Sequence, residues 1–373
     1  MRPAGRLTPV IQVIHKFDRR AGPDLLVGEM LRRLDRNRWR PSIFMLDFGL
    51  FAGPSLLEEM LPPDVPLTTV PWCGGRGLPG AIRAFRAMLR RSGAQLVHSH
   101  DIPSHLVSLP TRARQGPVRI ASVHGIVDQT PRQRQWNAVN RRLLRRLDHT
   151  IVSSDFVRDA LSGLDPGRTT LLLNAIETDA ITPRSAAPLA RIHTAADPLR
   201  IVCVARLSEE KGHRYLIEAI RRLGNAPVRL DVIGTGPLLD DLRRQAADLP
   251  RVHIHGFVAD ATPYFRTADI FALASIRESL SVGVLEAMAY GVPVLTTDVG
   301  AHPAVVGESG AGWILPRGDP DALAHAIRSV LDAPKRLPAM AARGVAAVRA
   351  HHSMDVYVDR ITGLYEAELN RRR

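Results

Sequence analysis

The sequence predicts an α/β protein with two domains, each built on a parallel sheet wound by helices. Short apolar segments alternate with segments of helical periodicity along the 373 residues, which is typical of a doubly wound sheet. Residues 178–200 hold three prolines and no clear period, so they read as a linker between two such series. A chain of this length also exceeds what one hydrophobic core usually holds.

Each element is expected where the apolar pattern has the matching period. In the first half we expect strands at 10–14, 42–48, 95–98, 119–123, 150–153 and 170–173, and helices at 25–34 and 80–91. In the second half we expect strands at 200–204, 229–233, 252–255, 270–274 and 292–296, and a last helix from 354 to about 369. The predicted domains are residues 1–185 and 186–353, with the helix 354–373 packing back on the first.

Composition points to a globular protein of the cytoplasm. Hydrophobic residues make up 45% and charged residues 23%, and no apolar run is long enough to span a bilayer. The apolar segment 10–14 is too short for a signal peptide. Cys73 and Cys203 give neither a disulfide framework nor a metal cluster.

The net charge of +13 is concentrated in the first half. Residues 1–190 carry 27 Lys and Arg against 16 Asp and Glu, whereas residues 191–373 carry 23 against 21. This asymmetry favours an anionic partner: nucleic acid, a phospholipid surface or a phosphorylated substrate. Residues 132–148 form a basic amphipathic segment around Trp136. Packing on the sheet explains its apolar stripe, while its arginines remain available for an anionic surface.

Two glutamates lie eight positions apart in the stretch 275–293. A predicted strand leads to Glu278, and a predicted helix carries Glu286 and ends at Gly291. Ligands bind at the carboxyl ends of strands in open α/β sheets, and a helix N-terminus favours an anion. Both glutamates could instead be ordinary solvated residues. Because Glu286 stands among apolar neighbours, where an unengaged charge is costly, we favour a site.

Two loops after other strands of the second half suit phosphate. Arg206 and Lys211 leave one loop beside a predicted helix start and could clamp a diphosphate from two sides, although they could equally be surface cations. Gly234 opens a Gly-Thr-Gly-Pro turn, which a tight strand-to-helix connection explains equally well.

Histidines gather at strand ends of the first half. His98 and His100 should point to one face of their strand, with Asp101 and His105 following. The spacing does not match a hydrolase metal motif, so a polar cluster is favoured over a metal site. His124 also ends a predicted strand and, on its own, reads as a structural histidine.

Together these motifs resemble glycosyltransferase family 4, the retaining nucleotide-sugar transferases of the GT-B fold. The strongest part is residues 278–286 followed by Ala-Met-Ala-Tyr-Gly-Val-Pro-Val, which is similar to the family's E-x7-E motif and its trailing helix. The other matching segments follow in family order along the chain: 174–177, 206–212, 234–237 and 256–258. The resemblance implies two Rossmann-like domains with the active site in the cleft between them.

The resemblance also implies roles. Arg206 and Lys211 would hold the donor diphosphate, and Glu278 would contact the sugar. Glu286 would bind the ribose hydroxyls, and His124 would contact the sugar from the first domain. The implied catalytic set is therefore Arg206, Lys211, Glu278 and His124. The remaining implied donor contacts are Gly234, the main chain near Val258, and Ser279, Leu280 and Ser281.

On the acceptor side the resemblance implicates Gly22 and His100. The family usually has a double glycine where residues 20–24 read Arg-Ala-Gly-Pro-Asp, and often a glycine or proline where Ser281 stands. No metal and no cofactor is implied, because arginine and lysine neutralise the leaving group.

The function expected is retaining transfer of a sugar from a nucleoside diphosphate to an acceptor hydroxyl. The basic first half predicts a lipid-linked or saccharide acceptor at the inner membrane face, in glycolipid, lipopolysaccharide or exopolysaccharide synthesis, and no nucleic acid is expected. A nucleotide-sugar epimerase or hydrolase on the same fold remains an alternative, which would act without an acceptor. A non-catalytic nucleic-acid-binding protein remains another, but it leaves the phosphate-site loops of the less basic half unexplained.

Overall fold

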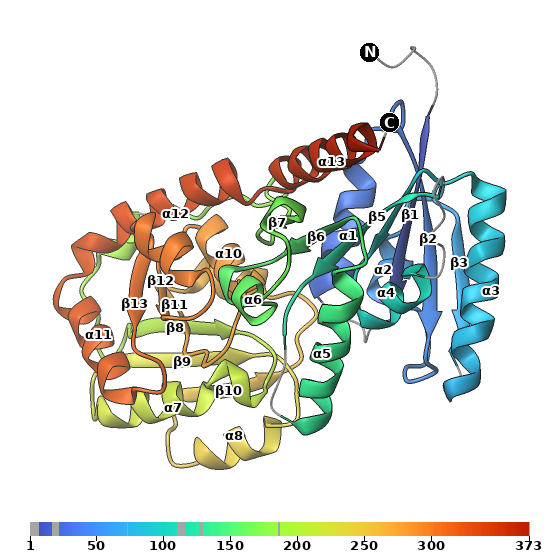
Figure 1. Ribbon diagram of the computed structural model, residues 1–373. Coiled ribbons are helices and arrows are strands. Elements are labelled where there is room, and N and C mark those ends of the chain that lie inside the picture. The colour runs from blue at the N-terminus through green and yellow to red at the C-terminus, as the bar shows by residue number, and fades with distance from the viewer. Residues whose placement is uncertain are drawn as a thin grey trace. The chain divides into compact units, whose positions relative to one another are not determined.

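The computed structural model describes residues 7–16, 22–72, 74–109, 116–126, 130–185 and 187–372. The chain divides into two compact units (Figure 1). Unit 1 comprises Met1–Leu173 and Met354–Arg373, and unit 2 comprises Asn174–Ser353. Contacts thus group residues 174–185 with unit 2, whereas the sequence placed the boundary at 185.

Unit 1 contains a seven-stranded parallel sheet in the order β3-β2-β1-β4-β5-β6-β7. Its strands are β1 (Thr8–His15), β2 (Trp39–Asp47), β3 (Leu67–Pro71), β4 (Leu96–Ser99), β5 (Val118–Val123), β6 (His149–Val152) and β7 (Thr169–Leu171). Its helices are α1 (Gly22–Arg33), α2 (Leu56–Met60), α3 (Gly74–Ser92), α4 (Ile102–Ser108), α5 (Pro131–Leu144), α6 (Asp155–Ala160) and α13 (Met354–Arg371), with a 3-10 turn at Pro166–Arg168.

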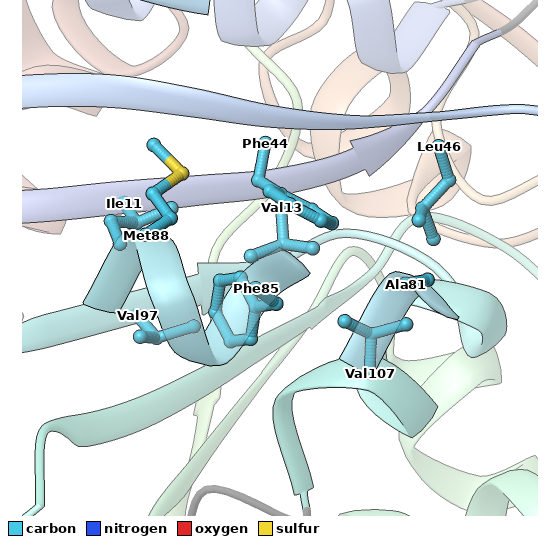
Figure 2. Packing of buried hydrophobic residues seen from close by; sticks show 9 residues of the cluster. All are labelled: Ile11, Val13, Phe44, Leu46, Ala81, Phe85, Met88, Val97 and Val107. Carbon is cyan, nitrogen blue, oxygen red and sulfur yellow. The ribbon is translucent and has the colours of Figure 1, made fainter. Parts of the chain in front are cut away.

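The core of unit 1 follows from the apolar runs of its central strands. A strand covered by helices on both faces buries consecutive residues, and β1 is buried along almost its whole length. Helix α3 presents Ala81, Phe85 and Met88 at helical spacing to the sheet, where Phe85 packs edge-on against Phe44 with ring centroids 5.0 Å apart (Figure 2). This packing fixes the carboxyl ends of β1 and β4, where polar side chains gather.

Unit 2 contains a six-stranded parallel sheet in the order β10-β9-β8-β11-β12-β13. Its strands are β8 (Leu199–Val204), β9 (Val228–Ile233), β10 (Val252–Gly256), β11 (Ile270–Leu273), β12 (Val294–Thr297) and β13 (Gly312–Leu315). Its helices are α7 (His213–Arg222), α8 (Leu239–Gln245), α9 (Thr262–Thr267), α10 (Val282–Ala289), α11 (Pro320–Asp332) and α12 (Leu337–His351). Short helical turns lie at Ala187–Ala190, Glu209–Lys211, Pro303–Glu308 and Pro334–Arg336.

The order of these strands contains a switch point. The chain runs outward from β8 to β10, returns to β11 on the other side of β8, and runs outward again to β13. From β8 and from β11 the chain therefore continues towards opposite edges of the sheet. In open α/β sheets a ligand binds at the carboxyl ends of such a pair of strands.

The proline-containing segment predicted as a linker is fixed to unit 2. Leu189 is fully buried, and the backbone N–H of Arg184 donates to the carbonyl of Tyr290 at 2.9 Å. The Arg191 guanidinium donates two hydrogen bonds, 2.5 and 2.8 Å long, to the buried carboxylate of Asp269. The linker interpretation was therefore wrong for this part of the segment, because a buried ion pair with two hydrogen bonds holds it in place.

Candidate active site

The loops that leave β8 and β11 lie against one another at the switch point of unit 2. The backbone N–H of Ile276 donates to the carbonyl of Glu210 at 2.8 Å. Gly212 has a positive φ of 65°, and a Cβ atom there would lie 2.0 Å from the carbonyl oxygen of Ala274. Only glycine fits this position, so the sequence Lys211-Gly212 brings the lysine next to the β11 loop.

The side chains of Lys211 and Glu278 meet there as an ion pair, Lys211 Nζ donating to Glu278 Oε2. Their side chains are only 17% and 14% exposed. The other oxygen of Glu278 accepts from the backbone N–H of Ser279 at 3.2 Å. The structure thus brings together two of the predicted site residues, a cation and an anion that are both largely desolvated.

Arg206 leaves the same loop as Lys211, and its side chain is exposed. Among the residues that the structure describes, its side chain forms no hydrogen bond or ion pair. Burial acts to raise the pKa of Glu210, but a hydrogen bond from Ser208 and the charges of Lys211 and Arg206 lower it overall. Arg206 therefore remains available to an anion beside Lys211.

Helix α10 begins at this position, and its first backbone N–H groups have no acceptor within the helix. Ser281 is the N-cap and makes no side-chain capping hydrogen bond. A Cβ atom at Gly283 would lie 2.6 Å from the carbonyl oxygen of Val204, so this glycine lets the start of α10 approach the end of β8. The free N–H groups and the helix dipole together favour an anion at this point.

The backbone of the predicted donor contacts 279–281 is held by hydrogen bonds from Asn174 and Ala301. The Asn174 side chain donates to the carbonyl of Leu280 at 3.1 Å, and the N–H of Ala301 donates to the carbonyl of Ser279 at 2.7 Å. Gly300, with φ of 52°, permits that approach, because a Cβ atom there would lie 2.2 Å from the same carbonyl oxygen. All three donor-contact residues are buried.

The sequence analysis missed His302, whose side chain contacts the backbone of Ser281. The N–H of Ser281 points at His302 Nε2 at 3.4 Å. His302 Nδ1 lies 2.9 Å from the hydroxyl of Thr296, which in turn donates to the carbonyl of Leu273 at 3.0 Å. Burial lowers the pKa of His302 to about 4, with Glu278 opposing and Lys211 adding to the shift, so the ring is neutral and can accept from Ser281.

The two remaining donor-loop predictions lie on neighbouring strands. Gly234 follows β9 with φ of 142°, and a Cβ atom there would lie 1.9 Å from the carbonyl oxygen of Ala205, so packing against the Arg206 loop accounts for the glycine. Val258 is half-buried and follows β10, whose end is tied to Gly234 by a 2.9 Å backbone hydrogen bond from Gly234 to Gly256. Both loops therefore belong to the same sheet edge as Lys211.

Glu286 lies within α10 and is half-buried, whereas its neighbours Leu285 and Ala287 are fully buried. Partial exposure reduces the cost that its apolar sequence context suggested. The structure places it on the helix that starts at the site, five residues after Ser281.

In unit 1 the predicted histidines lie together. His100 and His124 are stacked, and His100 Nδ1 is 3.2 Å from His124 Nε2. The prediction that His98 and His100 share a face is confirmed, since their ring centroids are 4.1 Å apart. Gly22, the predicted acceptor-loop residue, is the first residue of α1, and residues 17–21 before it lie outside the described residues.

The histidine cluster is hydrogen-bonded to protein groups. His105 Nδ1 lies 2.8 Å from the hydroxyl of Ser99, and His98 Nε2 lies 2.7 Å from that of Ser122. Within the part of the chain that the structure describes, no group of three or more histidine, cysteine, aspartate or glutamate side chains is arranged to hold a metal ion.

Two family models match the chain, one on each half. "Glycosyltransferase Family 4" matches residues 22–180, and "Glycosyl transferases group 1" matches residues 198–333. The chain belongs to this family of glycosyltransferases and has its GT-B fold of two Rossmann-like parallel-sheet units.

Individual relatives agree with this assignment. A Mycolicibacterium smegmatis protein named GDP-mannose-dependent alpha-(1-6)-phosphatidylinositol monomannoside mannosyltransferase is 29% identical over 74% of this chain and 78% of its own. The lipopolysaccharide core biosynthesis glycosyltransferase LpsE of Rhizobium meliloti is 32% identical over 38% of this chain and 42% of its own. Anabaena HepE, solved in complex with UDP, superposes with a TM-score of 0.78 at 18% identity, covering 96% of this chain and 99% of its own.

Proposed function

We propose that the protein transfers a sugar, with retention at the anomeric carbon, from a nucleoside diphosphate to the hydroxyl of a glycolipid or saccharide acceptor. The observation that supports this most is the meeting of Lys211, Glu278 and the start of α10 at the switch point of unit 2. Two cations and free N–H groups at one sheet edge suit a diphosphate leaving group, whose developing charge they would stabilise.

The remaining roles extend this proposal. Glu278 would leave Lys211 to contact a sugar hydroxyl, Glu286 would bind the ribose, and the main chain near Val258 would meet the base. His124 of unit 1 would contact the sugar. These roles rest on the family motifs, and the positions of Gly234 and Val258 at the same sheet edge as Lys211 support them.

The acceptor and its location form the finer part of the proposal. The named relatives act on phosphatidylinositol mannoside or in lipopolysaccharide core synthesis, and we propose an acceptor of this chemistry at an anionic membrane face. No helix in the described ranges is long and apolar enough to cross a bilayer. We propose that contact with the membrane is made through the surface of unit 1, which exposes Arg142 on helix α5 and Arg146 just after the end of that helix.

The proposal is tested first by donor binding. Thermal unfolding in the presence of UDP-, GDP-, ADP- and TDP-sugars should show a raised midpoint with one nucleotide, because a ligand that binds only the folded state stabilises it. With that donor, Arg206→Ala and Lys211→Ala should each lower turnover roughly a hundredfold or more. Arg349→Ala, which removes an exposed arginine of α12, is the matched control. Near-normal turnover in both site variants would exclude the diphosphate role.

Product analysis separates transfer from the alternative reactions. Transfer with retention gives an α-linked product from an α-linked donor and should persist in EDTA, since the fixed cations neutralise the leaving group. Release of free sugar, or a changed configuration elsewhere in the sugar ring without an acceptor, would favour a hydrolase or an epimerase. Complete loss of transfer in EDTA would show that a metal ion, rather than Arg206 and Lys211, neutralises the diphosphate.

A further inference from the structure

Six polar side chains form a continuous chain of hydrogen bonds through the interior of unit 1. His124 Nε2 is 3.2 Å from His100 Nδ1, and His100 Nε2 is 2.8 Å from Gln12 Oε1. Gln12 Nε2 donates to the Tyr365 hydroxyl at 3.2 Å, the hydroxyl is 2.7 Å from His98 Nδ1, and His98 Nε2 is 2.7 Å from the Ser122 hydroxyl. This hydrogen-bond chain starts at His124, just after β5, reaches helix α13 at Tyr365 and ends at Ser122 of β5.

The groups in this chain are neutral. Burial lowers the pKa of His98 and of His100 well below the usual value, with further lowering by neighbouring histidines, and burial lowers that of His124 to about 4. Burial also raises the pKa of Tyr365, which keeps its hydroxyl protonated. A neutral imidazole has one donor and one acceptor nitrogen, so each hydrogen bond fixes the direction of the next.

The orientation of the Gln12 amide sets the direction. Its oxygen faces His100 Nε2, which must therefore carry a proton, so His100 Nδ1 is an acceptor. His124 can satisfy that acceptor only by donating from Nε2. On the other side, the Gln12 amide group donates to Tyr365, whose hydroxyl then donates to His98 Nδ1. Exchanging the positions of the oxygen and nitrogen of the Gln12 amide would reverse the donor and the acceptor in every hydrogen bond of this hydrogen-bond chain.

We propose that Gln12 and Tyr365 are positioning residues that hold His124 in the tautomer protonated at Nε2. The lone pair is then on Nδ1, where it can accept a hydrogen bond from a sugar hydroxyl. This function of the tautomer rests on the proposed contact between His124 and the sugar. The tautomer itself rests on the hydrogen-bond chain alone.

Register explains why these residues meet although they are far apart in the sequence. Gln12 of β1 pairs directly with His98 of β4, and His98 pairs with Ile120 of β5. Tyr365 of α13 joins Gln12 to His98. Its side chain is fully buried and packs against Trp39, with ring centroids 5.4 Å apart. Every member of the chain except His124 is buried, so water does not replace a lost partner at low cost.

The test is nitrogen NMR of protein labelled with [15N]histidine, with the His124 signal assigned from its loss in His124→Gln. In the unchanged protein, Nε2 of His124 should be the protonated nitrogen. Gln12→Met removes the acceptor of His100, so His124 should become a mixture of tautomers. Gln12→Glu keeps an acceptor at the same place, so the original tautomer should remain.

Tyr365→Phe gives a second test that introduces no charge. Without the hydroxyl, nothing distinguishes the two ends of the Gln12 amide, so both tautomers of His124 should be populated. Ser99→Ala is the matched control, because it also removes a buried hydrogen bond to a histidine, His105, but lies outside the chain. It should leave the His124 signal unchanged.

Activity then separates this proposal from the proposed function. In Gln12→Met and Tyr365→Phe, kcat should fall about tenfold or more while KM for the donor changes less, because misorientation of a reacting contact acts on the transition state. Protonation of His124 at Nδ1 in the unchanged protein, or an unchanged His124 signal in both variants, would overturn the positioning role. The expected NMR changes with unaltered transfer would confirm the tautomer assignment and overturn the sugar contact of His124.

Discussion

At the residue scale, the pairing of Lys211 with Glu278 couples the two roles proposed for these side chains. A largely desolvated charge is costly without a partner, and each of the two supplies the other. A diphosphate bound to Lys211 would therefore release Glu278, whose carboxylate would become available to a sugar hydroxyl. The phosphate and sugar contacts would then form together rather than independently.

This coupling gives Glu278 and Glu286 different mutational signatures. Glu278→Ala should lower transfer from the sugar donor roughly a hundredfold, yet leave the affinity for the free nucleoside diphosphate no weaker, since it frees Lys211. Glu286→Ala should instead weaken that affinity about tenfold or more by removing hydrogen bonds to the ribose. Calorimetric titration with the nucleoside diphosphate measures both affinities.

Glu308→Ala serves as the control for both variants, since Glu308 is an exposed glutamate of unit 2. It should change neither transfer nor affinity. Equal losses of nucleotide affinity in Glu278→Ala and Glu286→Ala would mean that the two roles are assigned wrongly.

At the element scale, helix α5 combines a buried side with an exposed basic one. Leu143 and Leu144 are buried, whereas Trp136 is 43% exposed and stands among arginines. The guanidinium groups of Arg141 and Arg145 donate to carbonyl groups of the following segment. Packing therefore explains only part of the apolar stripe, and Trp136 suits the boundary between water and lipid.

Replacing Arg142 and Arg146 by glutamine should weaken binding to vesicles that contain anionic lipid. A basic residue near such a surface contributes about 1 kcal/mol, so the double variant should lose roughly thirtyfold in affinity. Binding should also fall as salt rises. Vesicle sedimentation measures it, and nucleotide binding should be unchanged.

The control for this experiment is the replacement of Arg336 and Arg349, two exposed arginines of unit 2, by glutamine. It removes the same charge and should leave vesicle binding nearly intact. Duplex DNA at the same ionic strength is the competing ligand. Tight DNA binding without vesicle binding would contradict the assignment of this surface to lipid.

An element could be predicted from the sequence when its own residues carry the signal for it. The buried strands of both sheets were predicted because each is a short apolar run, but β3 (Leu67–Pro71) was missed because it is only partly buried and ends in proline. Strand β13 (Gly312–Leu315) was missed because it is short and half-buried. Helices α2, α4, α6, α9, α11 and α12 were also not predicted.

The site shows the same limit. The loops with Lys211 and Glu278 could be found from motifs, because glycines and charged residues after strands are local signals. The support of Ser281 by His302, 21 positions later, could not be found in this way. Nor could the contact of Gln12 with Tyr365, 353 positions apart, because it depends on strand register and on the return of the last helix to unit 1.

At the scale of the whole molecule, the neutral buried histidines should make the protein sensitive to acid. Burial lowers the pKa of four of them to about 4: His105, His124, His213 and His302. Between that value and 6.5, the unfolded chain binds protons that the folded protein does not. The stability that these groups contribute is therefore complete above pH 6.5 and is lost as the pH falls towards 4.

Asp24 acts in the opposite direction, because burial raises the pKa of its carboxyl group to about 6. The stability that Asp24 contributes grows as the pH falls below about 6. This gain comes from one group, whereas the loss comes from four histidines. The thermal midpoint should thus decrease from pH 6.5 to pH 4, which calorimetry measures. His302→Asn should reduce the slope, whereas His325→Asn, at an exposed position of α11, should not. A thermal midpoint that stays constant from pH 6.5 to pH 4 would contradict the predicted loss of stability in acid.

The return of α13 to unit 1 has a consequence for the order in which the protein can mature during translation. All of unit 2 is made between the first 173 residues and Met354, so unit 2 has every one of its strands before unit 1 has its last helix. Until Tyr365 is synthesised, Gln12 and His98 lack the hydroxyl that joins them. The interior of the nascent N-terminal sheet therefore stays incomplete until the last helix has been made, whatever unit 2 does in the meantime.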